Sequence, residues 1–412
     1  MGLQTACKDL EWSSQESLTE LGELAKTAGL TVTQSISQKR ETPHPTFYVG
    51  KGKLSELGDV IKEHSIEVLV TDDELSANQQ KRLEETLSIK ILDRTALILD
   101  IFALRAQTRE AQLQVEMAQL EYLRPRLTRL WTHLSRLGGG IGTRGPGEKQ
   151  LEVDKRRLNQ RLSHIKRKLT HIESQRQLTR HHRDSIPVMN GAIVGYTNAG
   201  KSTLLNQLTQ ADVLAEDRLF ATLDPTTRHL ELPSQERVLL TDTVGFIQKL
   251  PHQLVSSFRA TLEEITQSQF ILHVIDASHP NLMGMIHTSN LILEDLNAES
   301  IPRLYVFNKA DQVKDLRRLK GSTTLPHPHL FISAFRQSDL TLLQHAIVEL
   351  LKPFHECLSF RIPYSRMDVL ALLHDHGHIL EEAYEQEGIR IRVDIHQVVG
   401  HKIMAMLGKD SS

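Results

Sequence analysis

The sequence has few cysteines, no long apolar run and almost no net charge, and each absence narrows the class of protein. Only Cys7 and Cys357 are present, without CxxC spacing, which argues against a disulfide framework or a zinc site and fits a reducing compartment. The longest apolar run, residues 96–104, is broken by Asp100 and is well short of the roughly 20 residues that a membrane span needs. The chain does not open with a basic segment followed by an apolar one, so we expect no signal peptide and a cytoplasmic location.

The length of 412 residues allows several domains, and changes in composition and hydrophobic pattern along the chain predict four. Residues 1–103 combine helical patterns with apolar runs at 68–70 and 89–92, which predicts a small α/β subdomain with parallel strands. Residues 104–185 contain two long helical patterns, at 104–137 and 151–178, which predict a helical hairpin with a Gly-rich tip.

Residues 186–354 repeat strand–loop–helix units, the pattern of a doubly wound, mostly parallel sheet. The predicted strands of this sheet are 192–194, 237–241, 270–275, 303–307 and 330–332. Residues 355–412 predict a small α+β domain, with strands at 358–362 and 389–395 around a helix at 367–385. The fold class is therefore α/β, with smaller domains on either side of a nucleotide-binding sheet.

Charge is distributed unevenly along the chain, although the net charge is only −2. Residues 105–183 contain eighteen Lys and Arg against seven Asp and Glu, a net charge of +11, and the remainder carries −13. Such a segment in an otherwise acidic protein indicates contact with a phosphate backbone. The alternative is a solvated face of a long charged helix. Aromatic residues are few in this segment, which favours folded RNA over stacked single strands.

A phosphate-binding loop follows the first strand of the sheet. Residues 195–202 match G-x-x-x-x-G-K-[ST] without a mismatch and open a helix. Backbone amides at such a loop point at phosphates, Lys201 adds a positive charge, and the Ser202 hydroxyl suits Mg²⁺. The predicted nucleotide-binding residues here are Gly195, Tyr196, Thr197, Asn198, Ala199, Gly200, Lys201 and Ser202.

A second element, Asp242, Thr243, Val244 and Gly245, follows the apolar strand at 237–241. An Asp at this strand end suits a Mg²⁺ site, and the Gly245 amide is placed to sense a γ-phosphate. We therefore predict catalytic roles for Lys201 and Gly245. The next residue is Phe246, where many GTPases have a water-orienting Gln. A phenyl ring cannot orient water by hydrogen bonding, so we predict that the protein alone hydrolyses the nucleotide slowly and that a partner accelerates this reaction. Gln248, two residues later, is the alternative residue for orienting the water.

The base-reading element is Asn308, Lys309, Ala310 and Asp311, which follows the strand at 303–307. A carboxylate at Asp311 would accept hydrogen bonds from the ring N–H and amino group of guanine, which adenine cannot supply. Ser333, Ala334 and Phe335 follow the next strand and suit a contact with the guanine carbonyl. GTP is therefore the predicted substrate.

The first switch is predicted at Phe220, Ala221, Thr222, Leu223 and Asp224. A threonine in this segment is expected to complete the coordination of Mg²⁺ when the γ-phosphate is bound. We prefer Thr222, as a catalytic residue, and keep Thr226 as the second candidate.

Together with the runs at 48–53, 93–95 and 138–148, these motifs strongly resemble the HflX family of translational GTPases. The glycine-rich run at 138–148 is the most specific, and the resemblance covers nearly the whole chain. It implies Ser202 and Thr222 as Mg²⁺ ligands and binding to the large ribosomal subunit, in splitting, rescue or biogenesis. We expect a monomer that contacts RNA through Gly139, Gly140, Arg144 and Lys149.

Two alternatives remain open from the sequence. An RNA-binding assembly or placeholder factor with negligible turnover is compatible with Phe246. A second phosphate loop at residues 50–53, including an ATP site, is less favoured than a tight turn before a helix.

Overall fold

The computed structural model describes residues 1–4, 12–130, 146–183, 189–209, 219–220, 222–234, 236–250, 259–322 and 324–408. Contacts within the chain group it into two units. Unit 1 comprises Met1–Ser174, Arg218–Asp224 and Ile247–Ala260, and unit 2 comprises Gln175–Asp217, Pro225–Phe246 and Thr261–Ser412. Each unit combines several separate segments of the chain, whereas the sequence predicts four consecutive domains, so the division into four domains remains a prediction.

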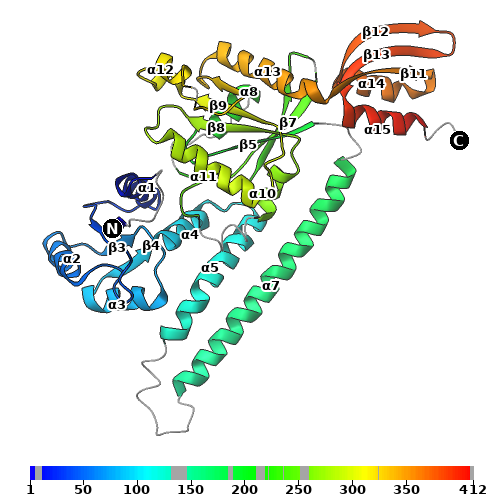
Figure 1. Ribbon diagram of the computed structural model, residues 1–412. Helices are drawn as coiled ribbons and strands as arrows, with labels where there is room; N and C mark the ends of the chain where they lie inside the picture. Colours follow the sequence, from blue (N-terminus) through cyan, green and yellow to red (C-terminus); the bar gives the residue numbers. More distant parts are fainter. Residues whose placement is uncertain are drawn as a thin grey trace. The chain divides into compact units, whose positions relative to one another are not determined.

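The N-terminal part of unit 1 contains the parallel strand pair that the sequence predicts (Figure 1). β3 (Val68–Thr71) and β4 (Lys90–Asp93) pair in parallel, and α3 (Ala77–Leu87) connects them. A capping box begins α3, because the Ser76 hydroxyl accepts the Gln79 amide and the Gln79 side chain accepts the Ser76 amide. The other elements are α1 (Ser14–Thr27), α2 (Lys51–Glu63), α4 (Arg94–Arg105), β1 (Gly2–Gln4) and β2 (Ser37–Lys39).

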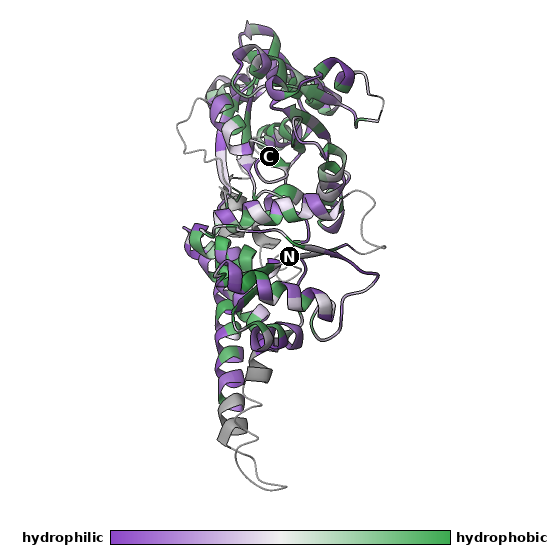
Figure 2. Ribbon diagram, turned by 90° about the vertical axis from the view of Figure 1, so that its left-hand side faces the viewer, coloured by the Kyte–Doolittle hydropathy of each residue, from purple (hydrophilic) through white to green (hydrophobic). Residues whose placement is uncertain are grey.

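Two long helices, α5 (Arg109–Leu130) and α7 (Pro146–Arg183), follow in chain order, as predicted. Arg161 of α7 forms a 2.6 Å ion pair with Glu116 of α5. An apolar cluster joins the same two helices through Leu113, Met117, Leu158, Leu162 and Ile165. The cluster residues recur three or four positions apart, so they share one face of each helix, with polar residues such as Glu116 and Gln160 between them. Figure 2 shows this mixture of hydrophilic and hydrophobic residues along the helices.

Unit 2 is built on a six-stranded sheet with strand order β10-β9-β8-β5-β7-β6. Five strands are parallel and confirm the predicted ones: β5 (Met189–Gly195), β7 (Arg237–Asp242), β8 (Phe270–Asp276), β9 (Arg303–Asn308) and β10 (His329–Phe331). The edge strand β6 (Thr226–Glu231) is antiparallel to β7 and was not predicted. Its residues are mostly polar and exposed, so no apolar run marks it, and pairing with β7 determines its structure.

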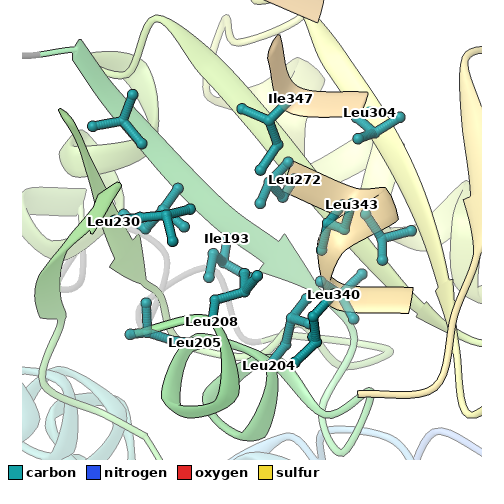
Figure 3. Close-up of a cluster of buried hydrophobic side chains, with 14 of the residues drawn as sticks. Ile193, Leu204, Leu205, Leu208, Leu230, Leu272, Leu304, Leu340, Leu343 and Ile347 are labelled. Atoms are coloured by element: carbon teal, nitrogen blue, oxygen red, sulfur yellow. The ribbon is translucent and has the colours of Figure 1, made fainter. Parts of the chain in front are cut away.

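Helices cover both faces of this sheet. Alternate strand residues face the helices α8 (Lys201–Thr209) and α13 (Gln337–Leu351) on one side and α11 (Leu282–Asp295) on the other. Figure 3 shows the first of these layers, with Ile193, Leu204, Leu205, Leu208, Leu230, Leu272, Leu304, Leu340, Leu343 and Ile347 packed together. The predicted α/β fold class is confirmed by this sheet and its two helical layers.

The C-terminal part of unit 2 differs from its prediction in one element. The predicted helix at 367–385 ends at His376, and residues 377–385 form a strand instead. Leu, Glu and Ala favour a helix locally, but this segment pairs antiparallel with β13, and that pairing overrides propensity. The order is β11 (His355–Ile362), α14 (Met367–His376), β12 (Gly377–Glu385), β13 (Gly388–His396) and α15 (Gln397–Gly408).

No helix in the described part of the chain is both long enough and apolar enough to cross a membrane.

Candidate nucleotide-binding site

The predicted phosphate loop joins the end of β5 to the start of α8, which confirms its structural context. β5 lies between β7 and β8, where the direction of the strand order reverses, and ligands bind at this point of a doubly wound sheet. Gly195 and Gly200 adopt φ values of 144° and 89°. A Cβ atom would lie 2.0 Å from the Val274 carbonyl oxygen at Gly195, and 2.4 Å from Asn308 Nδ2 at Gly200. Glycine is therefore required at both ends of the loop.

Lys201 lies at the first position of α8 and is 7% exposed. Its ammonium group donates a 2.9 Å hydrogen bond to the Tyr196 carbonyl oxygen across the loop. Burial lowers the pKa of Lys201 from 10.5 to about 8, and the Asp242 carboxylate opposes that change. Because this hydrogen bond joins a buried ammonium group to a neutral carbonyl, negatively charged phosphate oxygens would be a more favourable partner for Lys201.

The side chains of Ser202 and Asp242 meet beside this lysine. The Ser202 hydroxyl donates a 2.6 Å hydrogen bond to Asp242 Oδ2, although the two residues are forty positions apart. Asp242 ends β7 and is 1% exposed. Two oxygen donors, one of them a carboxylate, form the kind of pair that a hard cation prefers.

The segment after Asp242 lies directly against the phosphate loop. The Phe246 amide donates to the Gly195 carbonyl oxygen at 3.0 Å, and the Thr197 amide donates to the Phe246 carbonyl oxygen at 2.8 Å. At Gly245 a Cβ atom would lie 2.9 Å from the Lys201 ammonium nitrogen. Gly245 is thus adjacent to the group predicted to bind the γ-phosphate.

Two further residues of this segment are fixed by packing. Thr243 donates its hydroxyl to the Ile193 carbonyl oxygen at 2.8 Å and is fully buried. Phe246 is only 2% exposed, so its ring packs in the interior and presents no polar group to a water molecule. The Gln248 side chain, the alternative for orienting water, is buried in unit 1, where its Oε1 lies 3.0 Å from the Ser17 hydroxyl.

Asn308 braces the base-reading element from both sides. Its Nδ2 donates to the Ala199 carbonyl oxygen at 3.0 Å, and its Oδ1 accepts from the Ala334 amide at 3.1 Å. One buried side chain therefore ties together the phosphate loop, the end of β9 and the loop after β10. The sequence places Asn308 in the motif, but neither of these two partners follows from sequence spacing.

The other residues of the base-reading element surround Asn308. Lys309 pairs with Asp276 at 2.7 Å, and the sequence analysis did not single out Asp276. Asp311 lies in the short 3₁₀ helix Ala310–Gln312 and is exposed, so its carboxylate is accessible to a ligand. In the loop after β10, Ser333 and Ala334 are buried, whereas Phe335 is 76% exposed. These loops follow the carboxyl ends of β9 and β10. Because these strands are parallel to β5, the loops lie at the same edge of the sheet as the phosphate loop.

The predicted first switch belongs to unit 1, whereas the phosphate loop belongs to unit 2. Phe220 and Leu223 are buried, Thr222 is half-buried, and Ala221 lies outside the described residues. Thr226, the second candidate, begins β6 and pairs in register with Asp242. The choice of Thr222 as the magnesium ligand remains a prediction.

The predicted RNA-contact residues lie mostly outside the described part of the chain. Gly139, Gly140 and Arg144 fall in residues 131–145, and Lys149 lies near the start of α7.

The lowered pKa of Lys201 predicts a pH dependence of nucleotide binding. Above pH 8 the ammonium loses its proton in the nucleotide-free site, so binding of phosphates must first restore it. We expect the Kd for GDP to be constant from pH 7 to about 8 and then to rise by up to about tenfold per pH unit. Titration calorimetry in buffers of different ionisation enthalpy should detect the uptake of this proton. The variant Lys201→Arg is the control for ionisation of guanine itself, because arginine stays charged, and an equally steep rise in it would contradict the prediction.

Three sequence families match consecutive parts of the chain. One described as GTP-binding GTPase N-terminal matches residues 15–103, and one described as GTP-binding GTPase Middle Region matches residues 105–183. A third, described as 50S ribosome-binding GTPase, matches residues 190–309.

Curated proteins are similar over most of the chain. The GTPase HflX of Caldanaerobacter subterraneus subsp. tengcongensis is 47% identical over 383 residues, which cover 92% of this chain and 88% of that protein. The GTPase HflX of Escherichia coli K12 is 41% identical over 384 residues, covering 92% of this chain and 90% of that protein. Among solved structures, a GTP-binding protein from Sulfolobus solfataricus in complex with GDP aligns with 25% identity and a TM-score of 0.43, covering 85% and 97% of the two chains.

Proposed function

Because the chain belongs to the HflX family of GTPases, and so binds and hydrolyses GTP, we propose that it acts on the large ribosomal subunit. Its task would be ribosome splitting and rescue, or biogenesis. The family matched by residues 190–309 is described as ribosome-binding, which supports this partner. A ribosomal partner places the protein in the cytoplasm, and we propose that it works there as a monomer.

The observation that carries the ribosomal proposal is the exposed basic face of α7. Arg161 and Lys166 pair with Glu116 and Glu121 of α5. Other basic side chains along the same helix are exposed, and they are Lys155, Arg156, Arg157 and Arg167. A rigid helix that presents several cations in a row suits the phosphates of folded RNA, which are recognised by shape and charge. We propose that the chain from Gly139 to Lys149 completes this contact.

We propose that Mg²⁺ is held by Ser202 and Thr222, with Asp242 beside it. The 2.6 Å contact between the Ser202 hydroxyl and Asp242 fits this ion, because both groups offer hard oxygen atoms. When bound, the ion would neutralise charge that develops on the phosphates. Lys201 would exchange its bond to the Tyr196 carbonyl for the β- and γ-phosphates, and the Gly245 amide would contact the γ-phosphate.

Turnover by the free protein is proposed to be slow. Phe246 is buried and cannot hold the attacking water, and Gln248 is engaged in unit 1. A partner that orders the first switch (residues 220–224) and the segment after β7 (residues 242–249, the second switch) would complete the organisation of the site. The second candidate function, an RNA-binding placeholder factor with negligible turnover, is favoured by the same buried Phe246.

Multiple-turnover GTP hydrolysis, measured with and without large ribosomal subunits, tests the proposal. We expect the subunits to raise the rate severalfold. If the subunits bind but leave the rate unchanged, the placeholder function is supported instead. If the pure protein already turns over at full speed, the inference from Phe246 is wrong.

Removal of the basic face of α7 tests the site of RNA contact. The triple variant Lys155→Gln, Arg156→Gln and Arg167→Gln is expected to weaken binding to the large subunit. The slope of log K for this binding against log salt concentration should become shallower by about three. The matched control removes three cations from the helix α12 (Leu316–Lys320), with Arg317→Gln, Arg318→Gln and Lys320→Gln. Equal losses in both variants would show only a general electrostatic attraction and would contradict a contact by α7.

A further inference from the structure

At each of the two segments predicted to sense the nucleotide, the chain passes from one unit to the other. The segment Arg218–Asp224 belongs with unit 1, and Pro225 begins a stretch of unit 2. The chain returns at the second switch, because Phe246 belongs with unit 2 and Ile247 with unit 1. Each of the two segments is therefore continuous along the chain with both units.

The first switch is attached to the start of helix α5. Asp224 Oδ2 accepts hydrogen bonds from the backbone amides of Gln107 and Thr108, at 3.3 and 3.1 Å. The Thr108 hydroxyl donates to Asp224 Oδ1 and itself accepts the Ala111 amide at 3.1 Å. Thr108 thus caps α5, and Asp224 adds a negative charge at the same helix end, where the helix dipole stabilises it.

An aromatic contact supports this attachment. The ring of Phe220 meets the ring of Phe102 of α4 edge to face, with centroids 4.6 Å apart. Both rings are only 1–2% exposed, so the first switch is anchored at Phe220 as well as at Asp224. The side chain of Asp224, which the sequence predicts to bind nucleotide, forms its hydrogen bonds with Gln107 and Thr108 at the start of α5.

The second switch is attached to the end of β3. Lys249 pairs with Asp72 and, at 2.8 Å, with Asp73, which follow this strand. Asp72 is 3% exposed and also pairs with Arg94 at 2.6 Å. Burial opposes ionisation of Asp72, but Arg94 and Lys249 outweigh it and lower the pKa of this carboxyl group. A charged network of this burial is costly to break from one side, so it ties Lys249 firmly to unit 1.

We propose that Asp224 and Lys249 are positioning residues that couple the γ-phosphate site to unit 1. Reorganisation of the switches around GTP changes the Asp224 contact at the start of α5 and the Lys249 contact beside β3. By linkage, a partner that binds unit 1 changes the relative affinity for GTP and GDP by the same factor. The inference rests on the GTPase activity and not on the identity of that partner.

The Asp224–Thr108 contact is tested by a double-mutant cycle in the full-length protein. We measure the ratio of the Kd values for GDP and a non-hydrolysable GTP analogue in Asp224→Asn, Thr108→Ala and the double variant. Each single variant is expected to change this ratio by about fivefold or more, and the double variant to change it no further. Ratios within twofold of wild type, or effects that simply add, would overturn the proposal for Asp224.

A matched control separates this role from helix capping in general. Asp315→Asn removes the negative charge from an equivalent cap, since Asp315 Oδ1 accepts the Arg318 amide at 3.1 Å at the start of α12. This variant should leave the ratio unchanged. Lys249→Met should shift the ratio, whereas Lys53→Met, which breaks a surface pair with Glu56, should not. A shift of equal size in the controls would overturn the coupling.

Amide hydrogen exchange gives an independent readout. In the wild type, exchange at Gln107 and Thr108 should differ between the GDP and GTP-analogue complexes. In Asp224→Asn the two complexes should exchange alike at these amides. Identical wild-type protection in both complexes would overturn the inference while leaving GTP hydrolysis intact, and a protein that binds no guanine nucleotide would refute the GTPase activity instead.

Discussion

Replacement of Lys201 by alanine is expected to lower GTP hydrolysis by about a thousandfold or more. The ammonium is the buried cation beside Gly245 and the Ser202–Asp242 pair, and charge develops on the phosphates during the reaction. Its loss removes a preorganised donor from a water-excluded site, where such a donor has its largest effect. Single-turnover hydrolysis at saturating GTP, together with nucleotide affinity, measures this effect.

The matched control for this experiment is Lys53→Ala. Like Lys201, Lys53 follows a glycine at a helix start, within the Gly-Lys-Gly-Lys sequence of residues 50–53, but its side chain forms a 2.8 Å pair with Glu56. Hydrolysis should be unchanged in this variant. Binding of labelled ATP that survives Lys201→Ala but is lost in Lys53→Ala would instead support a second phosphate site at residues 50–53. Hydrolysis by Lys201→Ala within tenfold of the wild-type rate would contradict the role of Lys201.

Replacement of Asp311 by asparagine is expected to reverse the base preference of the site. The carboxylate is predicted to accept two hydrogen bonds from guanine, and an amide offers one acceptor and one donor instead. We expect GTP affinity to fall by about 10- to 100-fold, the equivalent of 1–3 kcal/mol for an unpaired polar group. Affinity for xanthosine triphosphate should rise, because xanthine presents a carbonyl oxygen where guanine has its amino group.

Competition binding with GTP and xanthosine triphosphate measures this change in base preference. Asp315→Asn is the control, since Asp315 lies four residues later and caps α12. An Asp311→Asn variant that still prefers GTP as strongly as the wild type would show that another group reads the base. The brace made by Asn308 should be unaffected, so the variant should retain its stability.

The structural context of the phosphate loop was predictable because the loop is one short contiguous run between a strand and a helix. The phosphate loop needs glycine at positions 195 and 200 and a helix that begins at Lys201, and all three are visible in a run of eight residues. The parallel strands were predictable because buried strands are continuous apolar runs. The family followed from the same local motifs and from the glycine-rich run at 138–148.

Two edge strands show where the same reasoning failed. β6 is polar and exposed, and β12 contains Leu, Glu and Ala residues that favour a helix, yet both form strands. Each has one neighbouring strand in its sheet, β7 or β13, and that neighbour supplies the hydrogen bonds that decide its conformation. Local propensity carries no information about a partner strand, so the sequence pattern could not indicate them.

The sequence by itself determined that this protein is a GTPase of the HflX family, and it predicts which lysine, serine and aspartate serve its guanine nucleotide site. The tertiary structure alone decided how these parts are held and what they are attached to. Asn308 reaches the phosphate loop across 109 positions, and Asp224 reaches the start of α5 across 116. Such contacts depend on which surfaces the folded chain brings together, and residue types and spacing do not specify them.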